Sequence, residues 1–148
     1  KVDGKIANAA VAEYVPGNMR SQVIKKGDNT IILDAYNANP SSMEAAIENL
    51  ATIKAKKKVV ILGDMFELEE EAEAEHKKIG ELLSRKKFDQ VYFCGNLMKA
   101  ANSVYEKGKL FEKKDHLIEY LKANKIHDST ILVKASRGIG LESIVEYL

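Results

Sequence analysis

The alternation of short apolar runs with amphipathic helical patterns constrains the fold of this chain more than any other feature. Strand-like runs lie at residues 21–26, 30–35, 58–64, 90–95, 108–111 and 129–136. Helical patterns lie at residues 40–53, 69–86, 97–107, 114–124 and 140–148. Parallel strands need crossover connections, and helices in those connections cover both faces of the sheet. The sequence therefore predicts a Rossmann-like α/β fold with three layers, α/β/α, around a mostly parallel sheet of about six strands.

The first two strand-like runs break this alternation. Only the turn Gly27-Asp28-Asn29 separates residues 21–26 from residues 30–35. A connection this short joins antiparallel neighbours. The sheet is therefore expected to carry one antiparallel edge strand.

The helix after the second run has a clear start but two candidate caps. Pro40 suits the first helical position. Asn39 can serve as the N-cap, and Ser41 with Glu44 three residues later forms an alternative capping box. Both alternatives stay open at the level of the sequence.

The composition is that of an ordinary globular domain. The chain has 148 residues, 45% of them hydrophobic and 30% charged, and a formal net charge of +1. This charge gives no reason to expect a nucleic-acid or membrane partner. Cys94 is the only cysteine, which excludes an internal disulfide and a zinc cluster, and its apolar surroundings predict a buried residue. Without a membrane-spanning stretch or a signal peptide, the expected location is the cytoplasm.

The first residues have the pattern of the end of a preceding unit. The chain begins without Met, and the helical apolar pattern of residues 4–15 stops at Pro16-Gly17, which is a boundary signal. We expect a fragment of a larger protein, in which one domain runs from residue 16 to residue 148.

Polar residues follow the strands at the edge where an open parallel sheet binds ligands. These segments are residues 34–40, 63–67, 95–96 and 134–138. Their charged or hydroxyl-bearing members include Asp34, Asp64, Glu67, Lys134, Ser136 and Arg137. The sequence therefore predicts a ligand site at this edge of the sheet.

Motifs that would activate phosphates are missing from the sequence. There is no G-x-x-x-x-G-K-[ST] loop, and no G-x-G-x-x-G follows the first strand. No Ser-His-Asp or Cys-His set is apparent, and His76, His116 and His127 lie in charged segments where exposure is expected. The predicted edge can recognise a nucleotide, but it has no means of its own to activate the phosphates.

Three segments carry a resemblance to a known family. They are "DAYNANPSSMEAAIENL" at residues 34–50, "VVILGDMFELEEEAEAEH" at residues 59–76 and "ILVKASRGIGLESIVEYL" at residues 131–148. In this order and spacing they resemble the C-terminal domain of the Mur ligases, in the branch that adds D-alanyl-D-alanine to UDP-N-acetylmuramoyl-tripeptide. The resemblance covers the chain from about residue 16 onward.

The resemblance implies an activity in peptidoglycan precursor synthesis. ATP would phosphorylate the tripeptide carboxylate, and the amine of D-alanyl-D-alanine would attack the acyl phosphate. ATP and Mg²⁺ would be bound mainly by a central domain that this chain lacks, and residues 1–15 would be the tail of that domain or an interdomain helix. The fragment would then hold no catalytic residue or metal site, would be inactive alone, and would be a monomer.

The resemblance also implies roles for individual residues. The nucleotide would be contacted by Asp34, Tyr36, Asn37 and Arg20, with Asp34 accepting hydrogen bonds from the ribose hydroxyls. The dipeptide or the tripeptide acceptor would be contacted by Lys134, Ser136, Arg137, Asp64 and Glu67. Capping of strand ends is an equal reading for Asp64 and Glu67, and Asn39 is a helix cap rather than a ligand. His76 matches a histidine of the family, and no role is assigned to it.

The chain departs from the family pattern at a few positions. Glu69 and Ala135 stand where glycines are usual, and Pro16-Gly17 is followed by Asn18-Met19-Arg20 where the family has P-G-R. Two other functions are kept as alternatives: a ligase of the same architecture that adds another amino acid, and a stand-alone nucleotide- or small-ligand-binding module. A purely structural interaction domain does not explain why acids and a Lys-Ser-Arg cluster follow the strands.

Overall fold

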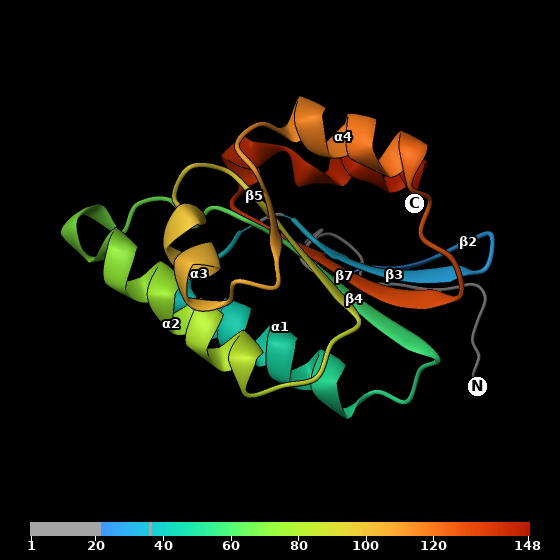
Figure 1. Ribbon diagram of the computed structural model, residues 1–148, viewed down its shortest axis with the longest axis horizontal. Coiled ribbons are helices and arrows are strands. Elements are labelled where there is room, and N and C mark those ends of the chain that lie inside the picture. The colour runs from blue at the N-terminus through green and yellow to red at the C-terminus, as the bar shows by residue number, and fades with distance from the viewer. Residues whose placement is uncertain (1–21, 36) are drawn as a thin grey trace.

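The computed structural model describes residues 22–35 and 37–148 (Figure 1). The strands are β2 (Gln22–Lys26), β3 (Asn29–Asp34), β4 (Lys57–Gly63), β5 (Gln90–Cys94), β6 (Lys109–Phe111) and β7 (Ser129–Lys134). The α-helices are α1 (Pro40–Thr52), α2 (Ala72–Ser84), α3 (Lys99–Val104) and α4 (Lys114–Ala123). Three 3₁₀ segments are η2 (Glu69–Glu71), η3 (Arg137–Ile139) and η4 (Leu141–Tyr147).

The six described strands form one sheet in the order β2-β3-β7-β4-β5-β6. Strand β2 pairs antiparallel with β3, and all the other pairs are parallel. The prediction of a mostly parallel sheet with one antiparallel edge is therefore confirmed. This order places β3, β7 and β4 side by side, so their carboxyl ends meet at one edge.

Helices cover both faces of the sheet (Figure 1), and an apolar core lies between the sheet and the helices on each face. On one face α1, α2 and α3 pack against side chains such as Val60, Leu62 and Leu132. On the other face α4 and η4 pack against the alternate strand residues, such as Ile61 and Val133. Successive strand residues point to opposite faces, so a strand covered on both sides must be apolar throughout. This requirement explains the continuous apolar runs of β4 and β7.

Helix α1 begins with a capping box. The Asn39 side chain accepts a hydrogen bond from the Ser42 backbone N–H at 2.9 Å, and the Ser42 hydroxyl accepts one from the Asn39 N–H at 3.1 Å. Asn39 is therefore the N-cap, as one of the two alternatives predicted, and the cap built on Ser41 and Glu44 does not form. The capping box fixes the start of α1 at Asn39.

The helix predicted at residues 69–86 is divided. Its first turn is the 3₁₀ segment η2, and the α-helix α2 begins only at Ala72. The closing segment η4 is also a 3₁₀ helix. Gly140, with a left-handed φ of 68°, ends the helical conformation of η3 and precedes η4. Among the described residues no helix is long and apolar enough to cross a membrane.

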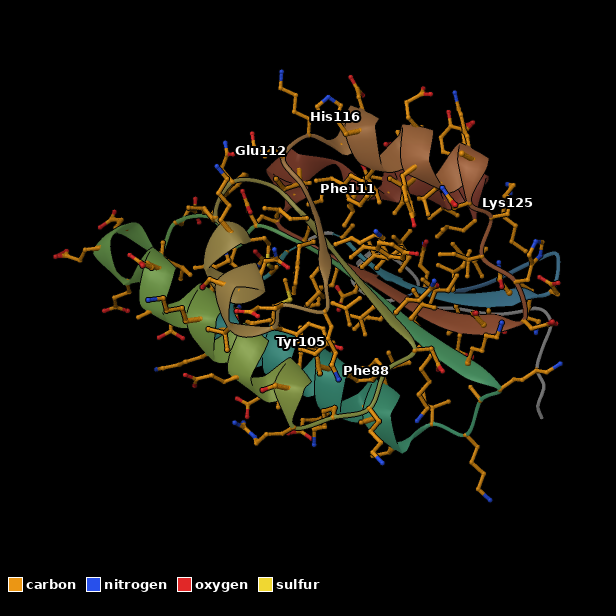
Figure 2. All side chains as sticks on the ribbon, viewed as in Figure 1. Phe88, Tyr105, Phe111, Glu112, His116 and Lys125 are labelled. Carbon is orange, nitrogen blue, oxygen red and sulfur yellow. The ribbon has the colours of Figure 1, made fainter. Side chains whose placement is uncertain are left out.

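The expectation that His76 lies at the surface is wrong. Its side chain is 0% exposed, within the core-facing side of α2 that also holds Ile79 and Leu83. The spacing of three and four residues from Ala72 to His76, Ile79 and Leu83 marks this face, so the helical pattern contained the signal. His116 and His127 are exposed as expected, and His116 lies on the outer side of α4 (Figure 2).

Candidate ligand-binding site

A pocket of about 330 Å³ opens where β3, β4 and β7 end. It is lined by Asn37, Phe66, Glu67, Ser136, Arg137 and Gly138. The lining comes from three separate strand exits, which the sheet order brings together. Four of the predicted site residues, Asn37, Glu67, Ser136 and Arg137, thus border one pocket at the edge that the sequence indicated.

The exit of β3 is tied to the end of β7 by a buried ion pair. Asp34 and Lys134 are neighbours in the parallel register, and Lys134 Nζ lies 2.8 Å from Asp34 Oδ2. The same ammonium donates to the Asn37 carbonyl oxygen at 3.2 Å. The Lys134 side chain is 1% exposed and that of Asp34 is 20% exposed. Lys134 therefore binds the loop next to the pocket, and a direct contact from Lys134 to a ligand stays a prediction.

The loop after β4 is held by hydrogen bonds from two other elements. The Ser136 N–H donates to the Asp64 carbonyl at 3.0 Å, and the Ser136 hydroxyl accepts from the Phe66 N–H at 2.8 Å. The Met65 N–H donates to His76 Nε2 at 3.0 Å, and His76 Nδ1 lies 2.7 Å from the Ala72 carbonyl. His76 therefore carries its proton on Nδ1 and acts as a fixed acceptor for the loop. These bonds fix the direction in which Phe66 and Glu67 leave the strand.

Asp64 faces helix α3 rather than the pocket. Its Oδ1 accepts a hydrogen bond from the Met98 N–H at 3.0 Å, and the residue is buried. Burial raises the pKa of this carboxyl, although backbone hydrogen bonds from Leu97 and Met98 act in the opposite direction. This geometry corresponds to the capping alternative for Asp64, and its contact with a substrate stays a prediction.

Buried Cys94 matches its predicted place in the core. It is the last residue of β5 and is 1% exposed. Burial raises the pKa of the thiol to about 11, and the charge of Asp64 adds to the rise. A thiol in this state is not a nucleophile at neutral pH.

Three exposed side chains form the rim of the pocket. Phe66 is 41% exposed although it is large and apolar, and the exposed residues Glu67 and Arg137 line the same pocket. Glu67 has a left-handed φ of 68°, which turns the chain sharply after Phe66. The sequence analysis did not single out Phe66; the signal available was an aromatic residue placed in the polar exit of a buried strand.

Two predicted nucleotide contacts and one boundary lie outside the described residues. These are Arg20, Tyr36 and the division between residues 1–15 and residues 16–148. The ligand roles of all nine predicted site residues stay predictions. Among the residues with described positions, no three His, Cys, Asp or Glu side chains come together as a metal site.

Ala135 stands where the family that the sequence resembles usually has a glycine, and Gly63 makes room for its methyl group. A Cβ at Gly63 would lie 2.6 Å from the Ala135 Cβ, so the two small residues face each other where β4 and β7 end. Gly63→Ala is expected to lower the free energy of unfolding by about 1–3 kcal/mol through overpacking. The same change in an Ala135→Gly background is expected to cost at least about 1 kcal/mol less, because the clashing methyl is gone. Denaturant unfolding of the four chains measures this coupling, and equal costs in both backgrounds would contradict the proposed contact.

Glu69, at the other position where that family usually has a glycine, is strained. Glu69 has a φ of 55°, a left-handed conformation that costs residues with a Cβ about 1–2 kcal/mol. Glu69→Gly is therefore expected to raise the free energy of unfolding by about 0.5–1 kcal/mol, after allowing for the greater chain entropy of glycine. The matched control is Glu70→Gly in the same 3₁₀ segment, which is expected to lower stability by a similar amount. Thermal unfolding compares them; a loss of stability in both variants would disprove the strain.

Comparisons with known proteins identify the family of this chain. Residues 19–137 match the family model described as "Mur ligase, glutamate ligase domain". The chain is 41% identical over 139 residues to the UDP-N-acetylmuramoyl-tripeptide--D-alanyl-D-alanine ligase of Bacillus subtilis (strain 168), in a match covering 88% of this chain and 30% of that protein. The protein of the same name from Escherichia coli (strain K12) is 35% identical over 150 residues, covering 99% and 32% of the two chains.

A solved structure matches over a similar range. The MurF ligase of Thermotoga maritima in complex with ADP superposes with a TM-score of 0.74 at 27% identity, covering 92% of this chain and 31% of that one. The chain thus spans about a third of the length of the proteins that it matches. Since the family model covers residues 19–137, most of the 148 residues, this chain belongs to the Mur ligase family.

Proposed function

We propose that this chain is the C-terminal domain of an ATP-dependent ligase that joins D-alanyl-D-alanine to UDP-N-acetylmuramoyl-tripeptide. The observation that carries the proposal is the 41% identity to the Bacillus subtilis ligase of that name, over 139 residues. The pocket formed by the exits of β3, β4 and β7 supports it, because open α/β sheets bind ligands at this edge. The domain would complete the nucleotide site and hold the incoming dipeptide.

The reaction proceeds in two steps. The γ-phosphoryl group of ATP is transferred to the tripeptide carboxylate, which gives an acyl phosphate and ADP. The amine of the dipeptide then attacks the acyl carbon, so that the C–N bond forms, the C–O bond to phosphate breaks, and the amine loses a proton. This domain would contribute by orienting the reactants and by excluding water, which would otherwise hydrolyse the acyl phosphate.

The nucleotide would lie against the exit of β3. Asp34 is partly exposed there, and among the described residues only Lys134 donates to its carboxylate, through Oδ2. Its other oxygen is suited to accept a hydrogen bond from a ribose hydroxyl. Asn37 lines the adjacent pocket, and Tyr36 and Arg20 are assigned to the same ligand by resemblance alone. The complex of the Thermotoga maritima ligase with ADP supports a nucleotide as the ligand.

The dipeptide or the tripeptide acceptor would lie on the side of β4 and β7. Arg137 and Glu67 are exposed in the pocket lining and carry the charges that a carboxylate and an ammonium group require. Ser136, Lys134 and Asp64 hold the surrounding loops in place in this structure. Direct contact of Ser136 and Asp64 with substrate is retained as a weaker part of the proposal, whereas the two bonds that Lys134 makes within the protein favour a positioning role for it.

Magnesium would be held outside the described residues. By resemblance to the Mur ligases, ATP and Mg²⁺ would be bound mainly by a central domain, in the portion of the relatives that this chain does not match. We place the reaction in the cytoplasm, where ATP is available.

The product of the full-length protein tests the proposal. Incubated with ATP, Mg²⁺, the UDP-linked tripeptide and D-alanyl-D-alanine, it is expected to form the tripeptide conjugate extended by the dipeptide, detected by mass spectrometry. The 148-residue chain alone is the control and is expected to form none. Extension by a single amino acid instead would favour the alternative ligase, and no product with any amino acid would favour a binding module.

A further inference from the structure

Lys134 is the most deeply buried charged residue near the pocket, and the reaction described above does not use it. We infer that Lys134 is a positioning residue that sets Asp34 and the loop after β3 for nucleotide binding, and that it does not contact substrate. This inference rests on the proposed function, because it presumes that a nucleotide lies against Asp34.

The position of Lys134 in the sheet supports this role. It is the last residue of β7 and lies in register with Asp34 on one side and Leu62 on the other. Its ammonium therefore starts from the centre of the sheet and reaches along the edge toward β3. There it binds Asp34 Oδ2 at 2.8 Å and the Asn37 carbonyl at 3.2 Å.

Burial argues against a direct ligand contact. An ammonium has three hydrogen-bond donors, and two of those of Lys134 are used within the protein. The side chain is 1% exposed, whereas Asp34 is 20% exposed. The third donor is covered together with the rest of the side chain, so a ligand would reach it only if the protein groups around it moved aside. The accessible group of the pair is Asp34, and Lys134 acts through it.

The two bonds also define what Lys134 positions. The bond to Asp34 orients its carboxylate. The bond to the Asn37 carbonyl holds the backbone two residues before Asn39, the N-cap of α1. Asp34 and Asn37 are thus held by the ammonium, and Asn39 is held by the capping box. Removal of the ammonium would release Asp34 and Asn37.

Kinetics of the full-length protein test the inference. Lys134→Met removes the charge at similar length and is expected to raise the KM for ATP on the order of tenfold, with the kcat and the KM for the dipeptide changed less than about twofold. In an Asp34→Asn background the same change is expected to have no further effect on the KM for ATP, because the group that Lys134 orients is already altered. The control is Lys58→Met. Lys58 also donates to a backbone carbonyl, that of Ala51, but it lies at the opposite end of β4. The Lys58→Met variant is expected to leave the KM for ATP unchanged.

Two outcomes would overturn the inference. A higher KM for the dipeptide that persists in the Asp34→Asn background would mean that Lys134 contacts substrate directly. Equal losses of all kinetic constants in Lys134→Met and Lys58→Met would mean that the residue is only structural.

A separate measurement decides the matter if the wild-type protein forms no amide bond, an outcome that would refute the proposed function. Amide hydrogen exchange of the full-length protein is then compared over residues 34–39. Faster exchange there in Lys134→Met, but not in Lys58→Met, would support positioning of the loop. Unchanged exchange would refute it.

Discussion

Replacement of Asp34 by Ala is expected to lower the free energy of unfolding by about 3–5 kcal/mol. The loss of stability comes from Lys134, the partner left without its counter-charge, and not from the missing carboxylate itself. Lys134 Nζ lies 2.8 Å from Asp34 Oδ2, in a side chain that is almost fully buried. Without Asp34 the ammonium keeps only the Asn37 carbonyl and becomes a buried charge with no counter-charge among the described residues. Denaturant unfolding of the chain, followed by circular dichroism, measures the loss.

The double variant Asp34→Ala/Lys134→Met is the control for this explanation. Because it removes both charges together, it is expected to recover most of the lost stability. In the full-length protein Asp34→Ala is also expected to raise the KM for ATP by about tenfold or more, through loss of the ribose contact. If the double variant were as unstable as the single one, the cost would not come from the unpaired lysine.

Replacement of Gly95 by Ala is expected to lower the free energy of unfolding by about 2–5 kcal/mol, from backbone strain and overpacking together. Gly95 has a φ of 123°, which residues with a Cβ rarely adopt. A Cβ there would lie 2.3–2.4 Å from all three atoms of the Asp64 carboxyl group. This carboxyl group cannot move aside without losing its hydrogen bond from the Met98 N–H, which connects β4 to the start of α3.

Gly27→Ala separates the two contributions to the loss at Gly95. Gly27 also has a left-handed φ, of 59°, but a Cβ there would meet nothing within 4 Å. Its replacement is therefore expected to cost only the conformational part, about 1–2 kcal/mol. Thermal unfolding of both variants measures the difference. Equal losses would show that Asp64 moves aside, and that the contact with Gly95 is not a constraint.

The architecture could be predicted from the sequence because the apolar runs of the strands and the amphipathic patterns of the helices are both strong in it. Continuous apolar runs such as β4 and β7 occur where helices cover both faces of a strand, and the short turn at Gly27 allows only an antiparallel neighbour. The pairing of β7 between β3 and β4 has no comparable signal in the sequence, because it depends on long-range packing. It is this pairing that brings three strand exits to one pocket.

The functions of polar residues at the strand ends were less predictable than their location. Lys134, Ser136 and Asp64 come at the sheet edge as predicted, yet each bonds to another loop of the protein. A sequence shows that a polar residue follows a strand, but which group it meets depends on a strand or helix far along the chain. His76 illustrates the same point, since its partners at Met65 and Ala72 allow an imidazole to be fully buried in a helix rich in acids.

The measurement that tests the central claim most directly is phosphate release from ATP by the full-length protein. It is made with UDP-N-acetylmuramoyl-tripeptide and Mg²⁺ present, with and without D-alanyl-D-alanine. Sustained release that requires both the tripeptide and the dipeptide is the expected result, because the acyl phosphate is consumed only when the dipeptide amine attacks it. Release at the same rate without the dipeptide would contradict the account, since this domain would then neither hold the dipeptide nor protect the intermediate from water.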